Sequence, residues 1–88
     1  MKPALVIGRV VASVKDPSLK GVKLLLLRCI RWSGETLNDY LIAADSVGAG
    51  AGEKVFYVEA RDASIAVHTN PPIDAAIIGI IDGVDFEE

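Results

Sequence analysis

Residues 75–81 read Ala-Ala-Ile-Ile-Gly-Ile-Ile and form the longest uncharged apolar run in the chain. These seven residues are too few for a transmembrane helix, which needs about 20. Because isoleucine favours strands, we expect a β-strand here. Side chains alternate along a strand, so we expect two apolar faces: Ala75, Ile77 and Ile81 on one side, and Ala76, Ile78 and Ile80 on the other.

Four earlier segments also contain strand-forming residues between turn sequences. They are residues 4–14, 23–32, 40–47 and 54–59. The leucines at 24–27 would also suit a helix. Pro17 and Gly21 are typical of a turn, and Ser33-Gly34-Glu35 is another. Five short strands separated by turns predict a mainly β fold, a small closed or nearly closed barrel.

A short helix is expected between the fourth and fifth strands. Asp62 is a suitable N-cap for residues 63–67, and Pro71 ends the segment because proline cannot continue a helix. So short a helix cannot cover the outside of a barrel. We therefore expect another chain to cover the outward apolar faces of the strands.

The composition also indicates surplus apolar surface. The chain has 88 residues, 51% of them apolar, and its mean hydropathy is +0.39. A single domain over residues 1–88 is expected at this length, with a modest core. Apolar surface that this core cannot hold marks an interface. The N-terminus has a charge at Arg9, too early for a signal peptide, so we expect a self-associating cytoplasmic protein.

The formal net charge of −3 is unevenly distributed. Residues 1–31 carry seven Lys and Arg residues against Asp16, whereas residues 32–88 carry two against eleven acidic residues. Such runs are often only solvated surface, or the basic and acidic edges of neighbouring subunits meet. A basic nucleic-acid stripe is a third interpretation, and the sequence pI of about 5.0 counts against it.

The glycine-rich segment 48–53 invites comparison with phosphate-binding loops. It lacks both the Gly-Lys-Ser/Thr of the P-loop and the spacing of the dinucleotide-binding motif. Both motifs also need a following helix whose amides face the phosphate, and here the strand-like Val55-Phe56-Tyr57-Val58 follows. A tight turn is therefore expected, and in a ring its bare backbone would suit close approach to the symmetry axis.

Groups for catalysis or metal binding are sparse. Cys29 and His68 are the single Cys and the single His, which excludes an internal disulfide and a cysteine metal cluster. A Cys–His dyad is conceivable, but a free Cys is usually a small buried hydrophobe, and we expect His68 on a surface loop. Trp32 and Tyr40 are either a stacking platform for single-stranded nucleic acid or packing and interface anchors. We assign no catalytic residue, cofactor or metal ligand.

Four segments occur in a characteristic order along nearly the whole chain: GRVV at 8–11, KDPSLKGVKLLL at 15–26, ADSVGAGAGE at 44–53 and IDAAIIGIID at 73–82. Together they resemble the EutN/CcmL family, the pentameric vertex proteins of bacterial microcompartment shells. One segment departs from the family: relatives tend to carry Gly-Ser-Ser-Ala-Arg after the fourth strand, and residues 60–64 here read Ala-Arg-Asp-Ala-Ser.

The resemblance implies a five-stranded β-barrel related to the OB-fold, with a short helix between strands four and five. It also implies a cytoplasmic homopentamer that caps shell vertices among hexameric and trimeric shell proteins, with no nucleic-acid or membrane partner. One loop would lie beside the five-fold axis and its pore. The residues of this loop are Gly48, Ala49, Gly50, Ala51, Gly52 and Glu53.

Two other functions stay open from the residues alone. An OB-fold module for single-stranded nucleic acid or oligosaccharide would need a basic groove with interleaved aromatic residues, which the sequence does not offer. A small Cys/His enzyme would lose its activity, and keep its assembly, on Cys29→Ala.

Overall fold

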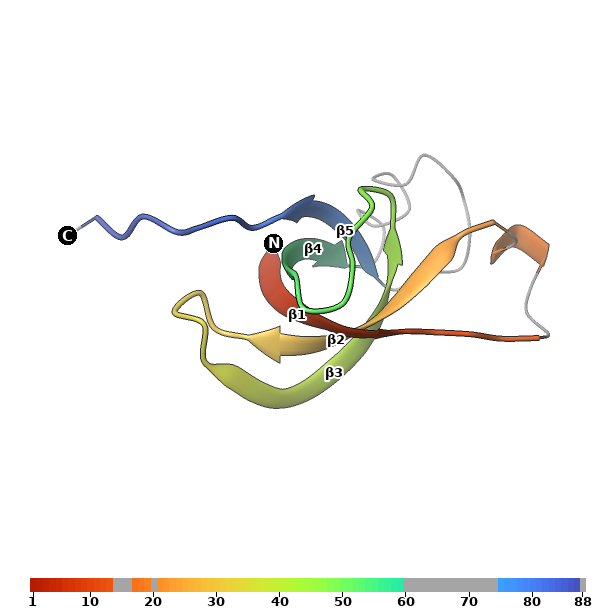
Figure 1. Cartoon of the computed structure of the whole chain (residues 1–88), viewed down its shortest axis with the longest axis horizontal. Helices are drawn as coiled ribbons and strands as arrows, with labels where there is room; N and C mark the ends of the chain where they lie inside the picture. Colours follow the sequence, from red (N-terminus) through yellow and green to blue (C-terminus); the bar gives the residue numbers. More distant parts are fainter. Residues whose placement is uncertain (14–16, 20, 60–74, 88) are drawn as a thin grey trace.

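Five strands form the body of the computed structural model, which describes residues 1–13, 17–19, 21–59 and 75–87. The strands are β1 (Lys2–Arg9), β2 (Lys23–Ile30), β3 (Thr36–Asp45), β4 (Lys54–Glu59) and β5 (Ala75–Ile80), and a single-turn 3₁₀-helix, η1 (Pro17–Leu19), follows β1. The strands close into a barrel in the order β1-β2-β3-β5-β4 (Figure 1). The predicted mainly β, five-stranded barrel is confirmed. The helix expected over 63–67 lies outside the described residues.

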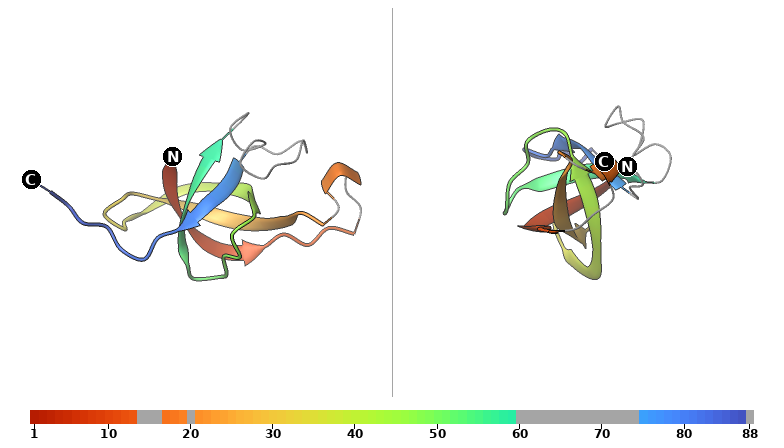
Figure 2. Two further views of the ribbon diagram at one scale, coloured as in Figure 1. Left: turned by 90° about the horizontal axis from the view of Figure 1, so that it is seen from above. Right: turned by 90° about the vertical axis from the view of Figure 1, so that its right-hand side faces the viewer.

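The strand connections explain the order around the barrel. Neighbouring strands are antiparallel except β3 and β5, which are parallel at Ala44–Ala76 and Asp45–Ile77. Segment 46–53 carries the chain from β3 across one end of the barrel to β4, which pairs with β1 and β5 (Figure 1). Figure 2 shows that η1 and the C-terminal segment extend from opposite ends of the barrel. Every strand pairs with two neighbours, although β3 meets β5 only at Ala44 and Asp45.

Small and medium aliphatic side chains fill the barrel. The largest fully buried ones are Val6, Leu27, Val55 and Ile77. In β2, Leu25 and Leu27 are buried whereas Leu24 and Leu26 are half-buried. This alternation is that of a strand, so the leucine run at 24–27 is not helical. Within the described residues, no helix is long and apolar enough to cross a membrane.

Most strand boundaries lie within two residues of the sequence-based expectation, and two differ by more. The strand expected over 4–14 ends at Arg9, because pairing with β2 continues only to the hydrogen bond from Val10 N to Leu24 O (2.9 Å), and Val11 is exposed. The strand expected over 40–47 begins at Thr36, where the β2–β3 hairpin starts directly after its turn.

The two faces of β5 also differ from simple alternation. Tyr57 pairs with Ile77 and Phe56 with Gly79, so Ile78 has no partner in the register. This β-bulge shifts the side-chain direction by one residue. As a result, Ile80 packs against the same core as Ile77, and the expectation that they occupy opposite faces is wrong. A bulge depends on the partner strand, which the pattern within one strand does not contain.

Candidate assembly surfaces

The loop between β3 and β4 is a compact turn held by a buried carboxylate. The Asp45 side chain is fully buried, and its oxygens accept hydrogen bonds from Val47 N (3.0 Å) and Ala49 N (2.9 Å). Lys23 Nζ lies 3.2 Å from the carboxylate and donates to Ala49 O at 2.7 Å. An aspartate that binds amides a few residues ahead is typical of turns. The ion pair compensates the burial of its charge.

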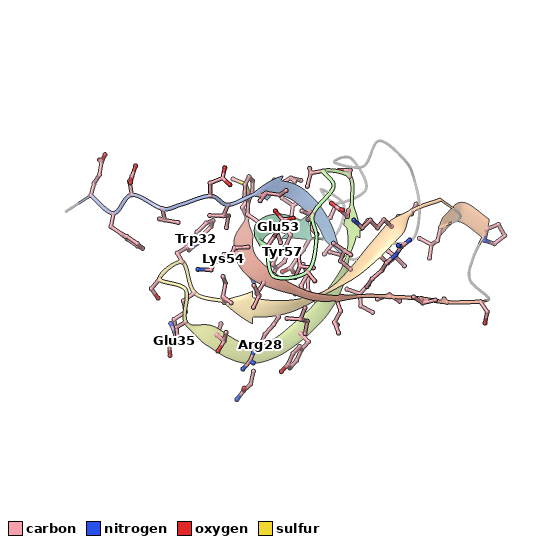
Figure 3. All side chains as sticks on the ribbon, in the orientation of Figure 1. Arg28, Trp32, Glu35, Glu53, Lys54 and Tyr57 are labelled. Atoms are coloured by element: carbon pink, nitrogen blue, oxygen red, sulfur yellow. The ribbon has the colours of Figure 1, made fainter. Side chains whose placement is uncertain are left out.

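The second half of the loop is held by Glu53 and by β1. Gly50 N donates to Glu53 Oε1 at 2.7 Å, Val6 N donates to Glu53 O at 2.9 Å, and Gly52 N donates to Val6 O at 2.8 Å. In Figure 3 Glu53 lies within the outline of the loop. Positive φ angles of 83° at Gly48 and 88° at Gly52 require glycine at both turns. The backbone of this loop is therefore fixed before any partner binds.

The six residues expected at an axis occupy different environments. Gly48, Ala51 and Gly52 are exposed, Gly50 and Glu53 are half-buried, and Ala49 is part of the hydrophobic core. The predicted tight turn is confirmed, and it presents mainly backbone and one methyl group. The sequence reasoning missed Asp45 and Lys23 as the groups that hold it. The only available signal was the Asp-Ser-Val-Gly order, which is typical of an Asx-turn.

An exposed apolar patch covers the outer face of β1, β2 and β3. We call it the sheet patch, and its residues are Ile7, Leu26, Arg28, Tyr40 and Ile42. Tyr40 is 55% exposed and Ile42 48% exposed, and they pair across the strands with Arg28 and Leu26. The Arg28 guanidinium lies 5.7 Å from the centre of the Tyr40 ring, and its Nε donates to Leu37 O at 2.8 Å. This stacking holds a positive charge within an apolar surface.

A second exposed patch lies where the chain leaves β5. Ile81 N donates to Lys54 O at 2.8 Å, and residues 82–87 then run away from the barrel as an extended segment (Figure 1). We call its apolar residues, together with Trp32 beside them, the tail patch: Trp32, Val84 and Phe86. Phe86 is 68% exposed. Trp32 and the tail border an open hollow of about 210 Å³.

Trp32 and Tyr40 do not form one stacking platform. Tyr40 pairs with Arg28 on the sheet patch, and in Figure 3 the labelled Arg28 lies below β3 while Trp32 lies beside the tail. Both rings are about half-exposed. Their placement fits the interpretation as interface anchors on two separate surfaces.

Cys29 faces the interior of the barrel. Its Sγ lies 3.7 Å from the hydroxyl of the buried Tyr57, and the thiol is half-buried. His68, the other member of the conceivable dyad, lies outside the described residues. In the part of the chain that the structure describes, no group of three or more His, Cys, Asp and Glu residues is placed to hold a metal ion.

Comparisons with known proteins agree in one family. The family model described as "Ethanolamine utilisation protein EutN/carboxysome" matches residues 1–82. The carboxysome shell vertex protein CcmL of Gloeobacter violaceus is 46% identical over 81 residues, which is 91% of this chain and 81% of CcmL. The microcompartment shell vertex protein EutN of Salmonella typhimurium is 38% identical over 85 residues, which is 96% of this chain and 86% of EutN.

Solved structures show the same relationship. The structure of Gloeobacter violaceus CcmL has a TM-score of 0.92 at 43% identity and covers 99% of this chain and 91% of its own. The GrpN pentameric microcompartment shell protein of Rhodospirillum rubrum has a TM-score of 0.88 at 35% identity and covers 98% of this chain and all of its own. With this fold and these relatives, the chain belongs to the EutN/CcmL family of microcompartment shell vertex proteins.

Proposed function

We propose that five copies of this chain form a cyclic pentamer that caps the vertices of a bacterial microcompartment shell. The observation that carries this proposal is the likeness, over nearly the full chain, to proteins named as shell vertex proteins and to one named as pentameric. Residues 1–88 would act as a single vertex domain, in the cytoplasm and within the shell. Its neighbours there would be the hexameric and trimeric proteins of the shell facets.

Physical features of the barrel support a ring. The strands satisfy one another in a closed order around the barrel, and exposed side chains on its outer face are available for contacts between subunits. The half-exposed aromatic and aliphatic residues of the sheet patch and the tail patch supply such contacts. A flat lattice of hexagons cannot close, and pentagons provide the curvature. Neither the described geometry nor the names of the relatives favours the alternative of a nucleic-acid or oligosaccharide module.

Residues 48–53 of the loop between β3 and β4 are the part that we propose to lie around the five-fold axis. Support comes from its exposed backbone at Gly48 and Gly52 and from the single small side chain of Ala51. Its hydrogen bonds to Asp45 and Glu53 hold it in one conformation. A fixed segment whose exposed residues are only glycine and alanine suits the crowded centre of a ring.

Native mass spectrometry of the purified chain at dilute concentration tests the assembly. We expect one species of five subunits, and a monomer at all concentrations would overturn the proposal. Co-expression with the hexameric and trimeric shell proteins tests the vertex role. Electron microscopy should then show closed polyhedral shells with this chain and open or elongated assemblies without it. Equal closure in both samples would contradict a role at the vertex.

A further inference from the structure

The sheet patch and the tail patch lie on different sides of one subunit. Arg28 marks the outer face of β2 and β3, and Trp32 marks the region where the tail leaves the barrel (Figure 3). Each patch exposes aromatic and aliphatic side chains that the subunit's own core does not use: Tyr40 and Ile42 on one, and Trp32 and Phe86 on the other. An exposed apolar patch of this kind marks an interface.

The charges of the two patches are complementary. The sheet patch holds the Arg28 guanidinium, which is half-buried against the Tyr40 ring. The tail alternates apolar and acidic residues, with Asp85 and Glu87 beside Val84 and Phe86. Opposite charges at the rim of an apolar contact set the orientation of the partners and disfavour wrong pairings. The tail of one molecule is therefore complementary to the sheet patch of another: both are apolar, and their charges are opposite.

The position of the tail allows it to reach such a partner. Beyond Ile81 the segment 82–87 runs in an extended form away from the barrel, so that Phe86 is 68% exposed (Figures 1 and 2). An extended segment of one chain gains most by lying on the surface of another, because its apolar residues then leave water. A second copy of this chain offers such a surface in its sheet patch, whose charge is opposite to that of the tail.

Ring symmetry adds a constraint. A closed ring of more than two identical subunits needs a heterologous interface, in which one patch of each subunit contacts a different patch of the next. A patch that contacted its own copy would give a dimer instead. Two dissimilar, complementary patches on different sides of the barrel meet this requirement.

We propose that the tail patch of each subunit packs on the sheet patch of the next. Residues 82–87 would lie across the outer face of the neighbour's β2 and β3, with Val84 and Phe86 against Tyr40 and Ile42 and the tail carboxylates towards Arg28. This inference rests on the proposed pentamer and specifies which surfaces of the barrel build it.

Complementary single-sided variants test this pairing. Ile42→Glu disables the sheet patch and leaves the tail intact, whereas Phe86→Glu disables the tail and leaves the sheet patch intact. In native mass spectrometry we expect each variant alone to lose the five-subunit species. Mixed in equal amounts, they should form a heterodimer and no larger ring, because only one functional pair of patches remains. Val11→Glu is the matched control, since Val11 is exposed outside both patches, and it should keep the pentamer.

The outcomes separate this inference from the pentamer itself. A monomeric unaltered chain would overturn the proposed function. If the unaltered chain is pentameric, three results would overturn only the pairing of patches. The first is an Ile42→Glu or Phe86→Glu variant that stays pentameric. The others are a mixture without the heterodimer and a Val11→Glu control that dissociates. Circular dichroism checks that each variant is folded. Arg28→Glu replaces Ile42→Glu if the latter does not fold, and the same mixture then decides.

Discussion

Tyr57 shows how a single polar group is accommodated within a small apolar barrel. The residue is buried on β4, and its hydroxyl lies 3.7 Å from Cys29 Sγ. Burial, followed by the hydrogen bond with Cys29, raises the pKa of the Tyr57 hydroxyl well above its ordinary value. The phenol therefore stays neutral in the folded barrel at pH values where an exposed tyrosine ionises.

This raised pKa predicts a loss of stability at high pH. Above pH 10, roughly the pKa of a free tyrosine, the unfolded chain releases a proton that the folded chain keeps, so stability falls with rising pH by up to about 1.4 kcal/mol per unit. Below that pH Tyr57 contributes no pH dependence. Urea denaturation from pH 8 to pH 11, at one protein concentration, measures the effect.

Tyr57→Phe is the matched variant for this measurement. It removes the ionisable group and keeps the ring, and lysines titrate equally in both proteins. We expect a cost of about 0.5–1.5 kcal/mol at pH 8 for the lost hydrogen bond, and a shallower decline above pH 10. Parallel pH profiles of the two proteins would contradict the assignment.

Among the elements, β5 depends most closely on its neighbour. Gly79 pairs with Phe56 across β4 and β5, and a Cβ built on Gly79 would overlap the Phe56 ring. The ring thus covers the bare backbone of a glycine, an arrangement known to stabilise strands that contain glycine. The same pair lies beside the bulge that turns Ile80 towards the core.

This contact predicts that Gly79→Ala destabilises the barrel by about 1–3 kcal/mol, because the added methyl group must displace the ring. The Gly79 backbone has an ordinary negative φ, so the cost is steric. In a Phe56→Leu background the same substitution should cost less, because leucine has no ring to displace. Urea denaturation of the unaltered chain, the two single variants and the double variant gives the coupling energy between positions 56 and 79. If Gly79→Ala costs the same stability with Phe or Leu at position 56, the overlap with the ring is not the cause.

At the scale of the whole molecule, the proposed position of the β3–β4 loop has a direct electrostatic consequence. The substitution Ala51→Asp adds one carboxylate per subunit at an exposed site. A ring with the loop at its centre would bring five of these carboxylates together. We expect Ala51→Asp to weaken pentamer association by about tenfold or more at low salt, with recovery at high salt as screening increases. Native mass spectrometry and light scattering over a salt series measure it.

Gly50→Asp should disturb the ring as well, but through a second cause. A Cβ at Gly50 would lie 3.5 Å from Glu53 Oε1, so this carboxylate also repels Glu53 within its own subunit. Ala51→Asp therefore tests the repulsion between subunits at the axis separately from repulsion within one subunit. Ala12→Asp, at an exposed position outside the loop, is the control. If the Ala51→Asp variant associates as strongly as this control at every salt concentration, the proposed position of the loop at the axis is wrong.

Sequence patterns anticipated the local features well. The strand over 54–59 was predicted with its observed bounds, because Val55, Phe56, Tyr57 and Val58 all favour strands and a glycine loop precedes them. The turn at 48–52 was equally clear, since glycine alone adopts its positive φ angles at low cost. The surplus of apolar surface was also evident from composition, and the exposed Tyr40, Ile42 and Phe86 confirm it.

The sequence by itself determined the five-stranded barrel, the tight glycine turn and the family, because strand-forming residues, turn residues and ordered motifs are local properties of the chain. Only the tertiary structure decided which apolar residues face inward after a bulge, that Lys23 and Asp45 hold the loop, and that Trp32 and Tyr40 lie on separate surfaces. These features depend on the pairing of segments far apart in sequence. The register between two strands is set jointly by both of them and by the turn that joins them.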